Sequence, residues 1–382
     1  MKKIKVMTVF GTRPEAIKMA PLVLELQKRE EIESIVCVTA QHREMLDQVL
    51  ELFEIKPDYD LDIMKERQTL TGITTRVLEG LGEVMAQVKP DIVLVHGDTT
   101  TTFAGALAAF YAGAKVGHVE AGLRTFDKWS PFPEEMNRRL TGAMTDIHFS
   151  PTVRNRENLL REGVDERTIF ITGNTVIDAL KTTVMDNYEF NSKELGEILK
   201  SDKTKILMTA HRRENLGEPL ENITKAARRI VEEFENVELI YPMHLNPAVR
   251  EVARKNMGGM ERIHLIEPLE PGDMHNAMAR VDIILTDSGG LQEEAPSLGK
   301  PVLVLRHETE RPEAIEAGTA ALAGVDEEVI YNMTKTLLTD GGEYDKMAKA
   351  VNPYGDGLAS KRTVDAILYM FGYGEKPEDF NV

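Results

Sequence analysis

Residues 4–18 read IKVMTVFGTRPEAIK, and this stretch predicts the fold. Its first part, Ile4–Val9, is a short apolar run of the kind that forms a buried strand. A glycine follows, and then Thr12 and Pro14 supply residue types that favour the start of a helix. A buried strand that leads directly into a helix is the repeating unit of a parallel sheet.

The same unit recurs through the first half of the chain. Further strand-like apolar runs occur at Ile35–Thr39, Ile92–Val95, Val116–Val119, Ile147–Phe149 and Ile169–Ile171. Helix-like segments alternate with them at Pro14–Arg29, Arg43–Phe53, Thr100–Ala112 and Arg154–Glu162. This alternation predicts an α/β domain in which helices cover both faces of a parallel sheet.

The pattern then restarts, which indicates a second domain of similar size. Its expected strands are Ile206–Thr209, Leu239–Tyr241, Ile283–Thr286 and Val302–Leu305. Its expected helices lie near Pro219–Phe234, Pro247–Asn256 and Gly290–Leu298. We therefore expect two Rossmann-like domains that face each other across a cleft, residues 1–175 and 176–357, with the boundary in the polar stretch Asn174–Lys203.

Composition excludes several classes of partner. The 382 residues include 46 basic and 63 acidic side chains, for a formal charge of −17. Nucleic acid or an anionic membrane as the main partner would require a basic surface, so we expect neither. Cys37 is the single cysteine, so no internal disulfide and no cysteine-based metal site are possible. The apolar start is too short for a signal peptide, which predicts a cytoplasmic enzyme.

Charged residues follow several of the predicted strands of the first domain. In an open parallel sheet, ligands bind outside the carboxyl ends of the strands. Arg13 follows the first strand and Lys18 lies one turn into the next helix, although a solvated helix start is an alternative reading. Asp98 and Glu120 each follow a strand beside a glycine. Capping of the next helix remains an alternative for Asp98 and fits Glu120 poorly.

A proline-rich segment supplies another carboxylate. Residues 129–139 read WSPFPEEMNRR, and the two prolines would rigidify a loop that presents Glu134 to the same crevice. A capping role for Glu134 and Glu135 at the next helix is an equally open reading.

The second half carries the features expected of an anion site. His211 follows a strand and is flanked by Arg212 and Arg213, which suits a pyrophosphate or a leaving group. Residues 285–294 read LTDSGGLQEE, in which a strand leads through Ser288, Gly289 and Gly290 into a helix. Backbone N–H groups at such a helix start bind phosphate, and Glu294 lies about one turn further, in reach of a ribose. A tight turn without a ligand is the alternative.

Motifs for cofactors are missing from the sequence. It contains no G-x-G-x-x-G after a strand, no Walker motif and no H-E-x-x-H. The carboxylates of Asp58–Asp62 lack the glycine of a calcium loop. We therefore expect neither a bound nicotinamide nor a metal.

Taken together, the motifs resemble those of the bacterial non-hydrolysing UDP-N-acetylglucosamine 2-epimerases. The matching segments are GTRPE at 11–15, VHGDT at 95–99, HVEAG at 118–122, GNT at 173–175, HRRE at 211–214, TDSGGLQEE at 286–294, GKP at 299–301, TERPE at 309–313 and NPYGDG at 352–357. The resemblance implies a glycosyltransferase-B-like fold and a homodimer. It also implies that residues 358–382, which contain the last predicted helix, Leu358–Phe371, return to the first domain and complete it.

The resemblance assigns expected roles to individual residues. Contacts with uridine diphosphate (UDP) would come from Arg13, His211, Ser288, Gly289, Gly290, Glu294 and Arg311. The sugar-side and acid–base residues would be Lys18, Asp98, Glu120 and Glu134, with His211 assisting catalysis at the leaving group. Activation by a second UDP-N-acetylglucosamine would involve Gln41, Arg67, Arg212 and His244.

The expected reaction interconverts UDP-N-acetylglucosamine and UDP-N-acetylmannosamine, for use in cell-surface polysaccharide. The C2 hydrogen is adjacent to no carbonyl, so we expect elimination of UDP to a 2-acetamidoglucal, followed by re-addition. This requires stabilisation of the leaving diphosphate and an acid and a base on opposite faces of C2. The sequence leaves open which carboxylate serves which face. Alternatives are a UDP-sugar glycosyltransferase of the same fold, a hydrolysing epimerase and a nucleotide-sugar sensor.

Overall fold

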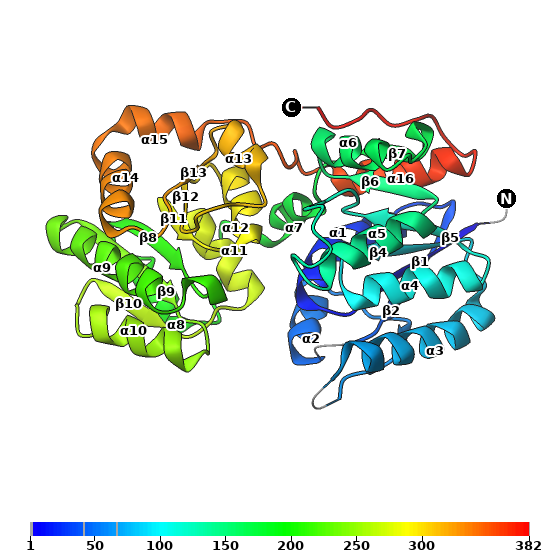
Figure 1. Ribbon diagram of the computed structural model, residues 1–382, viewed down its shortest axis with the longest axis horizontal. Helices are drawn as coiled ribbons and strands as arrows, with labels where there is room; N and C mark the ends of the chain where they lie inside the picture. The colour runs from blue at the N-terminus through cyan, green and yellow to red at the C-terminus, as the bar shows by residue number, and fades with distance from the viewer. Residues whose placement is uncertain (1–2, 41–42, 66–67, 382) are drawn as a thin grey trace. The chain divides into compact units, whose positions relative to one another are not determined.

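The computed structural model describes residues 3–40, 43–65 and 68–381 (Figure 1). The chain forms two compact α/β units. Unit 1 extends to Thr182 and resumes from Tyr354 to Asn381, and unit 2 is Thr183–Pro353. Among the described residues, no helix is both long and apolar enough to cross a membrane.

Unit 1 is built on a parallel sheet that, across its described residues, has seven strands. The strands are β1 (Ile4–Phe10), β2 (Ile32–Val38), β3 (Tyr59–Asp60), β4 (Ile92–His96), β5 (Lys115–Val119), β6 (Ile147–Ser150) and β7 (Ile169–Ile171). Their order in the sheet is β3-β2-β1-β4-β5-β6-β7, so the direction of strand addition reverses between β1 and β4. Such a switch point is where ligands bind in open α/β sheets.

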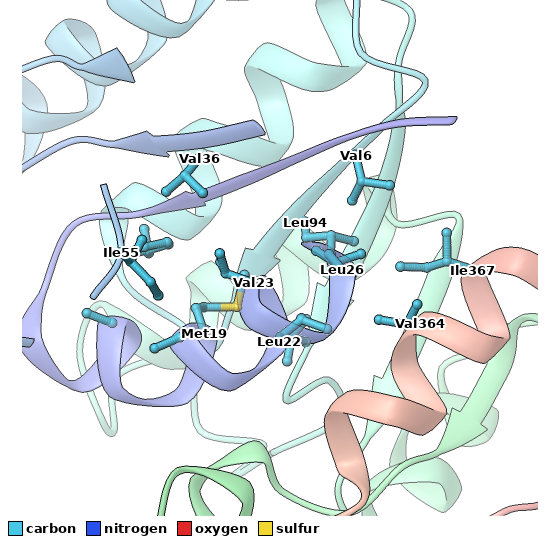
Figure 2. Close-up of a cluster of buried hydrophobic side chains, with 14 of the residues drawn as sticks. Val6, Met19, Leu22, Val23, Leu26, Val36, Ile55, Leu94, Val364 and Ile367 are labelled. Carbon is cyan, nitrogen blue, oxygen red and sulfur yellow. The ribbon is translucent and has the colours of Figure 1, made fainter. Parts of the chain in front are cut away.

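Helices cover both faces of this sheet. They are α1 (Arg13–Gln27), α2 (Arg43–Leu52), α3 (Leu70–Val88), α4 (Thr100–Tyr111), α5 (Glu134–Met144), α6 (Val153–Arg161), α7 (Thr175–Thr183) and α16 (Ala359–Met370), with a 3-10 turn at Glu166–Thr168. Alternate strand residues point to opposite faces. Val6 packs with α1 and α16, as Figure 2 shows, whereas Met7 packs in a second cluster with residues of α3 and α4.

Unit 2 repeats this architecture with a six-stranded parallel sheet. The strands are β8 (Thr204–Thr209), β9 (Val237–Pro242), β10 (Ile263–Ile266), β11 (Ile283–Thr286), β12 (Val302–Val304) and β13 (Ala320–Leu322). The order is β10-β9-β8-β11-β12-β13, which places a second switch point between β8 and β11. Apolar residues of α9 (Glu218–Glu233) and α14 (Glu327–Thr339), among them Ile223 and Ile330, pack on the buried strands.

The remaining elements of unit 2 are helices and 3-10 turns. The helices are α8 (Lys193–Ile198), α9 (Glu218–Glu233), α10 (Pro247–Met257), α11 (Pro271–Arg280), α12 (Gly289–Glu294), α13 (Pro312–Glu316), α14 (Glu327–Thr339) and α15 (Gly341–Ala348). The 3-10 turns are Arg213–Asn215 and Ala295–Leu298. The predicted class, α/β with parallel sheets and helices on both faces, is confirmed for both units.

The first unit boundary lies within the expected polar stretch Asn174–Lys203, seven residues after position 175/176, and the second lies four residues before position 357/358. They lie at Thr182/Thr183 and Pro353/Tyr354, so α7 belongs mostly to unit 1. Contacts of α7 explain this placement. The carboxylate of Asp178 accepts hydrogen bonds from the N–H groups of Ala359 and Ser360 at 3.1 and 2.7 Å, at the start of α16. These bonds join α7 to the returning chain.

Candidate functional site

Two loops meet at the switch point of unit 1, and the carboxylate of Glu15 joins them. One Glu15 oxygen accepts hydrogen bonds from the N–H groups of Gly11 and Thr12 at 3.0 and 2.8 Å. The other accepts from the hydroxyls of Thr99 and Thr102, at 2.6 and 3.2 Å, at the start of α4. Glu15 is 2% exposed, so these bonds are shielded from water. The buried carboxylate therefore fixes the loop after β1 to the loop after β4.

Gly11 has a steric role at the same point. A β-carbon on Gly11 would lie 1.8 Å from the hydroxyl oxygen of Thr39, which follows β2. No side chain fits there without displacing Thr39, so the close approach of the two strand ends requires glycine.

Glu120 lies directly after β5 in a cage of polar groups. Its φ of +61° lies in the left-handed region, which is rare for a residue with a side chain. One carboxylate oxygen forms an ion pair with Lys18, accepts a hydrogen bond from Asn174 Nδ2 at 3.0 Å and lies 3.5 Å from His96 Nε2. Burial opposes ionisation, but the Lys18 ammonium and the His96 ring outweigh it and hold the pKa of Glu120 well below its usual value.

Asp98 is held from α5. Arg138 Nε donates to Asp98 Oδ2 at 2.9 Å, and Arg138 Nη2 forms an ion pair with the same oxygen at 2.7 Å. Asn137 donates to the Asp98 carbonyl at 2.9 Å. Arg138 also contacts the fully buried Glu135 at 3.3 Å. Asp98 does not cap α4, because Thr99 does so through its hydroxyl. The capping alternative for Asp98 is therefore wrong.

Glu134 is the first residue of α5 rather than part of a loop. It is half-buried and lines a pocket of about 450 Å³ together with Arg13. The other lining residues are Thr12, Pro14, Met45, Leu70, Thr99, Thr100, Pro133 and Asn137. Burial lowers the pKa of Arg13. The neighbouring Glu135 points inward and accepts hydrogen bonds from the N–H groups of Thr125 and Phe126, at 3.0 and 3.1 Å.

Two buried histidines underlie the strand ends of unit 1. His118 and His148 are register partners on β5 and β6. His118 Nε2 is 2.7 Å from the Gly97 carbonyl, and Gly97 precedes Asp98. Burial lowers the pKa of His118 to about 3 and that of His148 to about 4. Both rings are therefore neutral at neutral pH, and His118 supports the loop that carries Asp98.

The switch point of unit 2 brings together the ends of β8 and β11. Asp287, after β11, is fully buried and accepts hydrogen bonds from the backbone N–H groups of His211 and Arg212 at 2.7 and 2.8 Å. The His211 ring is 40% exposed and stacks nearly parallel to His244, with ring centroids 5.2 Å apart. Burial lowers the pKa of His211, whereas the Asp287 carboxylate raises it in part.

The predicted phosphate segment has the expected turn into a helix. Ser288 is the residue before α12, and its N–H donates to the Thr286 hydroxyl at 2.9 Å. A β-carbon on Gly289 would lie 3.1 Å from the Arg311 guanidinium, so glycine leaves room for this side chain. Arg311 also contacts the carboxylates of Glu293 at 2.9 Å and Glu310 at 3.0 Å.

Other predicted residues fall nearby or outside the described structure. Glu294 Oε2 lies 3.8 Å from His275 Nε2, and burial lowers the pKa of His275 to about 4. Arg212 is half-buried beside His211. Gln41 and Arg67 lie outside the described residues. Within the part of the chain that is described, no group of three or more His, Cys, Asp or Glu side chains has a metal-binding arrangement.

The structure thus gathers the predicted residues into two sets, one at the switch point of each unit. The first contains Arg13, Lys18, Asp98, Glu120 and Glu134, and the second contains His211, Ser288, Gly289, Gly290, Glu294 and Arg311. The residues that support them, Glu15, His96 and Arg138, were not predicted. Glu15 and His96 lie inside the motifs of the family resemblance and Arg138 lies in the quoted proline-rich segment, so the sequence did contain a signal for all three.

Each of the two Rossmann-like units thus places predicted site residues at its switch point, with carboxylates, Arg13 and Lys18 in unit 1 and His211 with the segment 288–290 in unit 2. A family model described as UDP-N-acetylglucosamine 2-epimerase matches residues 24–368. The UDP-N-acetylglucosamine 2-epimerase of Bacillus subtilis (strain 168) is 65% identical over 381 residues, which cover 100% of this chain and 99% of the relative.

Solved structures are similar over the same extent. A co-structure of S. aureus MnaA with UDP has a TM-score of 0.88 and 55% identity and covers 100% of both chains. The UDP-GlcNAc 2-epimerase of Neisseria meningitidis, bound to UDP-GlcNAc, has a TM-score of 0.86 and 50% identity and covers 96% of this chain and 100% of the other. The chain belongs to the UDP-N-acetylglucosamine 2-epimerase family. The resemblance of the motifs, the glycosyltransferase-B-like fold and the assignment to the isomerases are confirmed.

Proposed function

We propose that the protein reversibly converts UDP-N-acetylglucosamine to UDP-N-acetylmannosamine. The main support for this proposal is the pair of carboxylates Asp98 and Glu120, which lie at the ends of the neighbouring strands β4 and β5 and are each held by ion pairs. A protein that only binds a nucleotide sugar needs no such acid–base set. The S. aureus relative holds UDP and the N. meningitidis relative holds UDP-GlcNAc, which supports the choice of substrate.

The proposed chemistry is elimination followed by addition. The C1–O bond breaks and its electron pair leaves with UDP, while a carboxylate removes the C2 proton and a C1–C2 double bond forms. Protonation of C2 from the opposite face and re-addition of UDP at C1 give the epimer. The proton transfers are assigned to Asp98, Glu120 and Glu134. Glu120 is ionised at neutral pH because of Lys18 and His96, so it acts as a proton acceptor before it acts as a donor.

Cations and backbone donors would stabilise the departing UDP. We assign this role to Arg13, His211 and Arg311, together with the N–H groups of Ser288–Gly290, and assign Glu294 to the ribose. Lys18 is assigned to the sugar side, where it also maintains the charge of Glu120.

Proton NMR of UDP-N-acetylglucosamine incubated with the enzyme in deuterated water tests the proposal. We expect UDP-N-acetylmannosamine with deuterium at C2, formed without an acceptor, added NAD or metal. A glycosyltransferase would leave the substrate unchanged without an acceptor. A hydrolysing epimerase would release free N-acetylmannosamine, and a sensor would show no turnover. A chelator that abolishes the reaction would contradict the proposed chemistry.

The same proposal extends to the setting of the enzyme. We propose a cytoplasmic homodimer that supplies UDP-N-acetylmannosamine for cell-surface polysaccharide. We also propose activation by a second UDP-N-acetylglucosamine through Gln41, Arg67, Arg212 and His244. Light scattering of the purified protein tests the dimer. Sigmoidal dependence of rate on substrate, lost in His244→Ala, tests the activation.

A further inference from the structure

Asp287 is the most deeply buried carboxylate at the switch point of unit 2, and its two oxygens differ. Three donors point at Oδ2: the N–H groups of His211 and Arg212 at 2.7 and 2.8 Å and Asn215 Nδ2 at 3.0 Å. Oδ1 is buried and has no hydrogen-bond partner among the described residues. Oδ1 is therefore a buried hydrogen-bond acceptor in need of a donor.

The ring of His211 is a candidate donor, whereas the Tyr241 hydroxyl, which also interacts with Asp287, already donates to the Ala210 carbonyl at 2.7 Å. His211 Nδ1 lies 3.6 Å from Asp287 Oδ1, which is an ion-pair distance and slightly longer than a hydrogen bond. The backbone bond from His211 to Oδ2 fixes the two residues in this orientation. Contacts of this kind commonly shorten when a substrate binds. Nδ1 therefore faces a buried anion, whereas Nε2 lies on the far side of the ring.

The other groups around His211 do not compete for Nδ1. His244 stacks on its face at 5.2 Å, and the Nδ1 of His244 already accepts the N–H of Asn246 at 3.1 Å. Arg212 is the adjacent residue and adds positive charge. Burial and these neighbours lower the pKa of His211, so the ring is neutral at neutral pH unless a further anion approaches it.

We propose that Asp287 is a positioning residue that holds the neutral His211 ring with its proton on Nδ1 and presents the lone pair of Nε2 to the substrate diphosphate. This inference rests on the role proposed for His211 above. When the diphosphate binds, a solvent proton joins Nε2, and the resulting imidazolium donates from Nδ1 to Asp287 and from Nε2 to a phosphate oxygen. A histidine that lies between two anions is stabilised in its charged form.

The Asp287→Asn substitution separates orientation from charge. The asparagine oxygen can replace Oδ2 and keep its three donors, which leaves the NH₂ group facing His211. That group donates to Nδ1, so the neutral ring must carry its proton on Nε2. Replacing the carboxylate behind the histidine of a protease triad in this way costs about 10,000-fold in kcat. Here the Nε2–H can still donate to phosphate, so we expect a loss of about 100-fold, the lower end for removal of an acid–base group.

Nitrogen NMR of the full chain labelled with ¹⁵N-histidine reads the tautomer directly, with His211 assigned by its absence in His211→Gln. We expect a protonated Nδ1 and an unprotonated Nε2 in the wild type, and the reverse in Asp287→Asn. Asp273→Asn is the matched control, because Asp273 is also buried and accepts N–H bonds from Asn191 and Ser192. Its His211 signals should not move. A wild-type ring protonated on Nε2 overturns the inference, even if Asp287→Asn does not fold.

Binding of UDP gives a second and independent measurement. Wild-type affinity for UDP should rise as the pH falls, because binding takes up a proton, whereas Asp287→Asn should lose this dependence. Equal dependence in both proteins overturns the inference. If His211→Gln keeps the wild-type turnover, the role of His211 in the proposed function is wrong, and the NMR result still decides the action of Asp287 on the ring.

Discussion

The neutral histidine pair of unit 1 makes the stability of that unit depend on acidity. His118 and His148 are each 1% exposed, and their pKa values of about 3 and about 4 lie below the ordinary value of 6.5. As the pH falls below 6.5, the unfolded chain takes up protons that the folded unit does not, so the free energy of unfolding decreases. Above that pH the full stability is present.

The size of the effect follows from the two pKa values. Each pH unit costs about 1.4 kcal/mol per ring, so lowering the pH from 6.5 to 5 costs about 2 kcal/mol for each ring and about 4 kcal/mol for the pair. Domains are stable by only about 5–15 kcal/mol, so this loss is large. The substitution His118→Gln should remove one ring's part of this pH-dependent loss of stability, because glutamine keeps an N–H donor for the Gly97 carbonyl but does not titrate.

Urea unfolding over a series of pH values tests this prediction. Trp129, the single tryptophan, lies in unit 1, so its fluorescence follows that unit. Carboxylates and the other histidines titrate in both the wild type and His118→Gln, so their effects cancel when the two free energies of unfolding are subtracted. We expect the stability of His118→Gln to decrease less steeply, by about 2 kcal/mol between pH 6.5 and 5. Parallel curves for the two proteins would refute the reasoning.

Three further predictions concern turnover and UDP binding. Removal of any one carboxylate, in Asp98→Asn, Glu120→Gln or Glu134→Gln, should lower turnover at least about 100-fold. Calorimetry should show that each variant still binds UDP. Wild-type rates in all three variants would exclude the carboxylate mechanism. Arg138→Lys keeps the charge but not the guanidinium that contacts Asp98 and Glu135 together, so turnover should fall about 10-fold with unchanged UDP affinity. Gly290→Val should weaken UDP binding at least about 10-fold, which corresponds to a loss of about 1.4 kcal/mol of binding free energy, without lowering the melting temperature. An unchanged affinity for UDP would mean that the phosphate binds elsewhere.

Strands and motif positions could be predicted from the sequence because they depend on local patterns. The expected strands at Ile169–Ile171 and Ile283–Thr286 match β7 and β11 at both ends. No range was predicted for helix α3, although the segment around Gly80–Gly82 has a helical pattern, because glycines and threonines interrupt that pattern. Its apolar residues, including Ile73, Val77 and Leu81, nevertheless lie on one buried face.

The groups that hold the site could not be predicted in the same way, because their partners are distant in sequence. Glu15 meets Thr99 and Thr102, and Arg138 meets Asp98, only after the sheet has brought β1, β4 and α5 together. Asp287 lies within a quoted motif, but its relation to His211 depends on the parallel pairing of β8 with β11. A motif indicates which residues matter, whereas the fold determines what each of them contacts.

The return of the chain to unit 1 has a consequence for synthesis on the ribosome. Val364, Ile367 and Leu368 of α16 belong to the same buried cluster as Leu22 and Leu26 of α1, yet they are made after the whole of unit 2. The nascent first unit therefore exposes this apolar face until almost the entire chain has been translated. Unit 2 is contiguous from Thr183 to Pro353 and can complete its core earlier, so the second unit in sequence is the first that can finish folding.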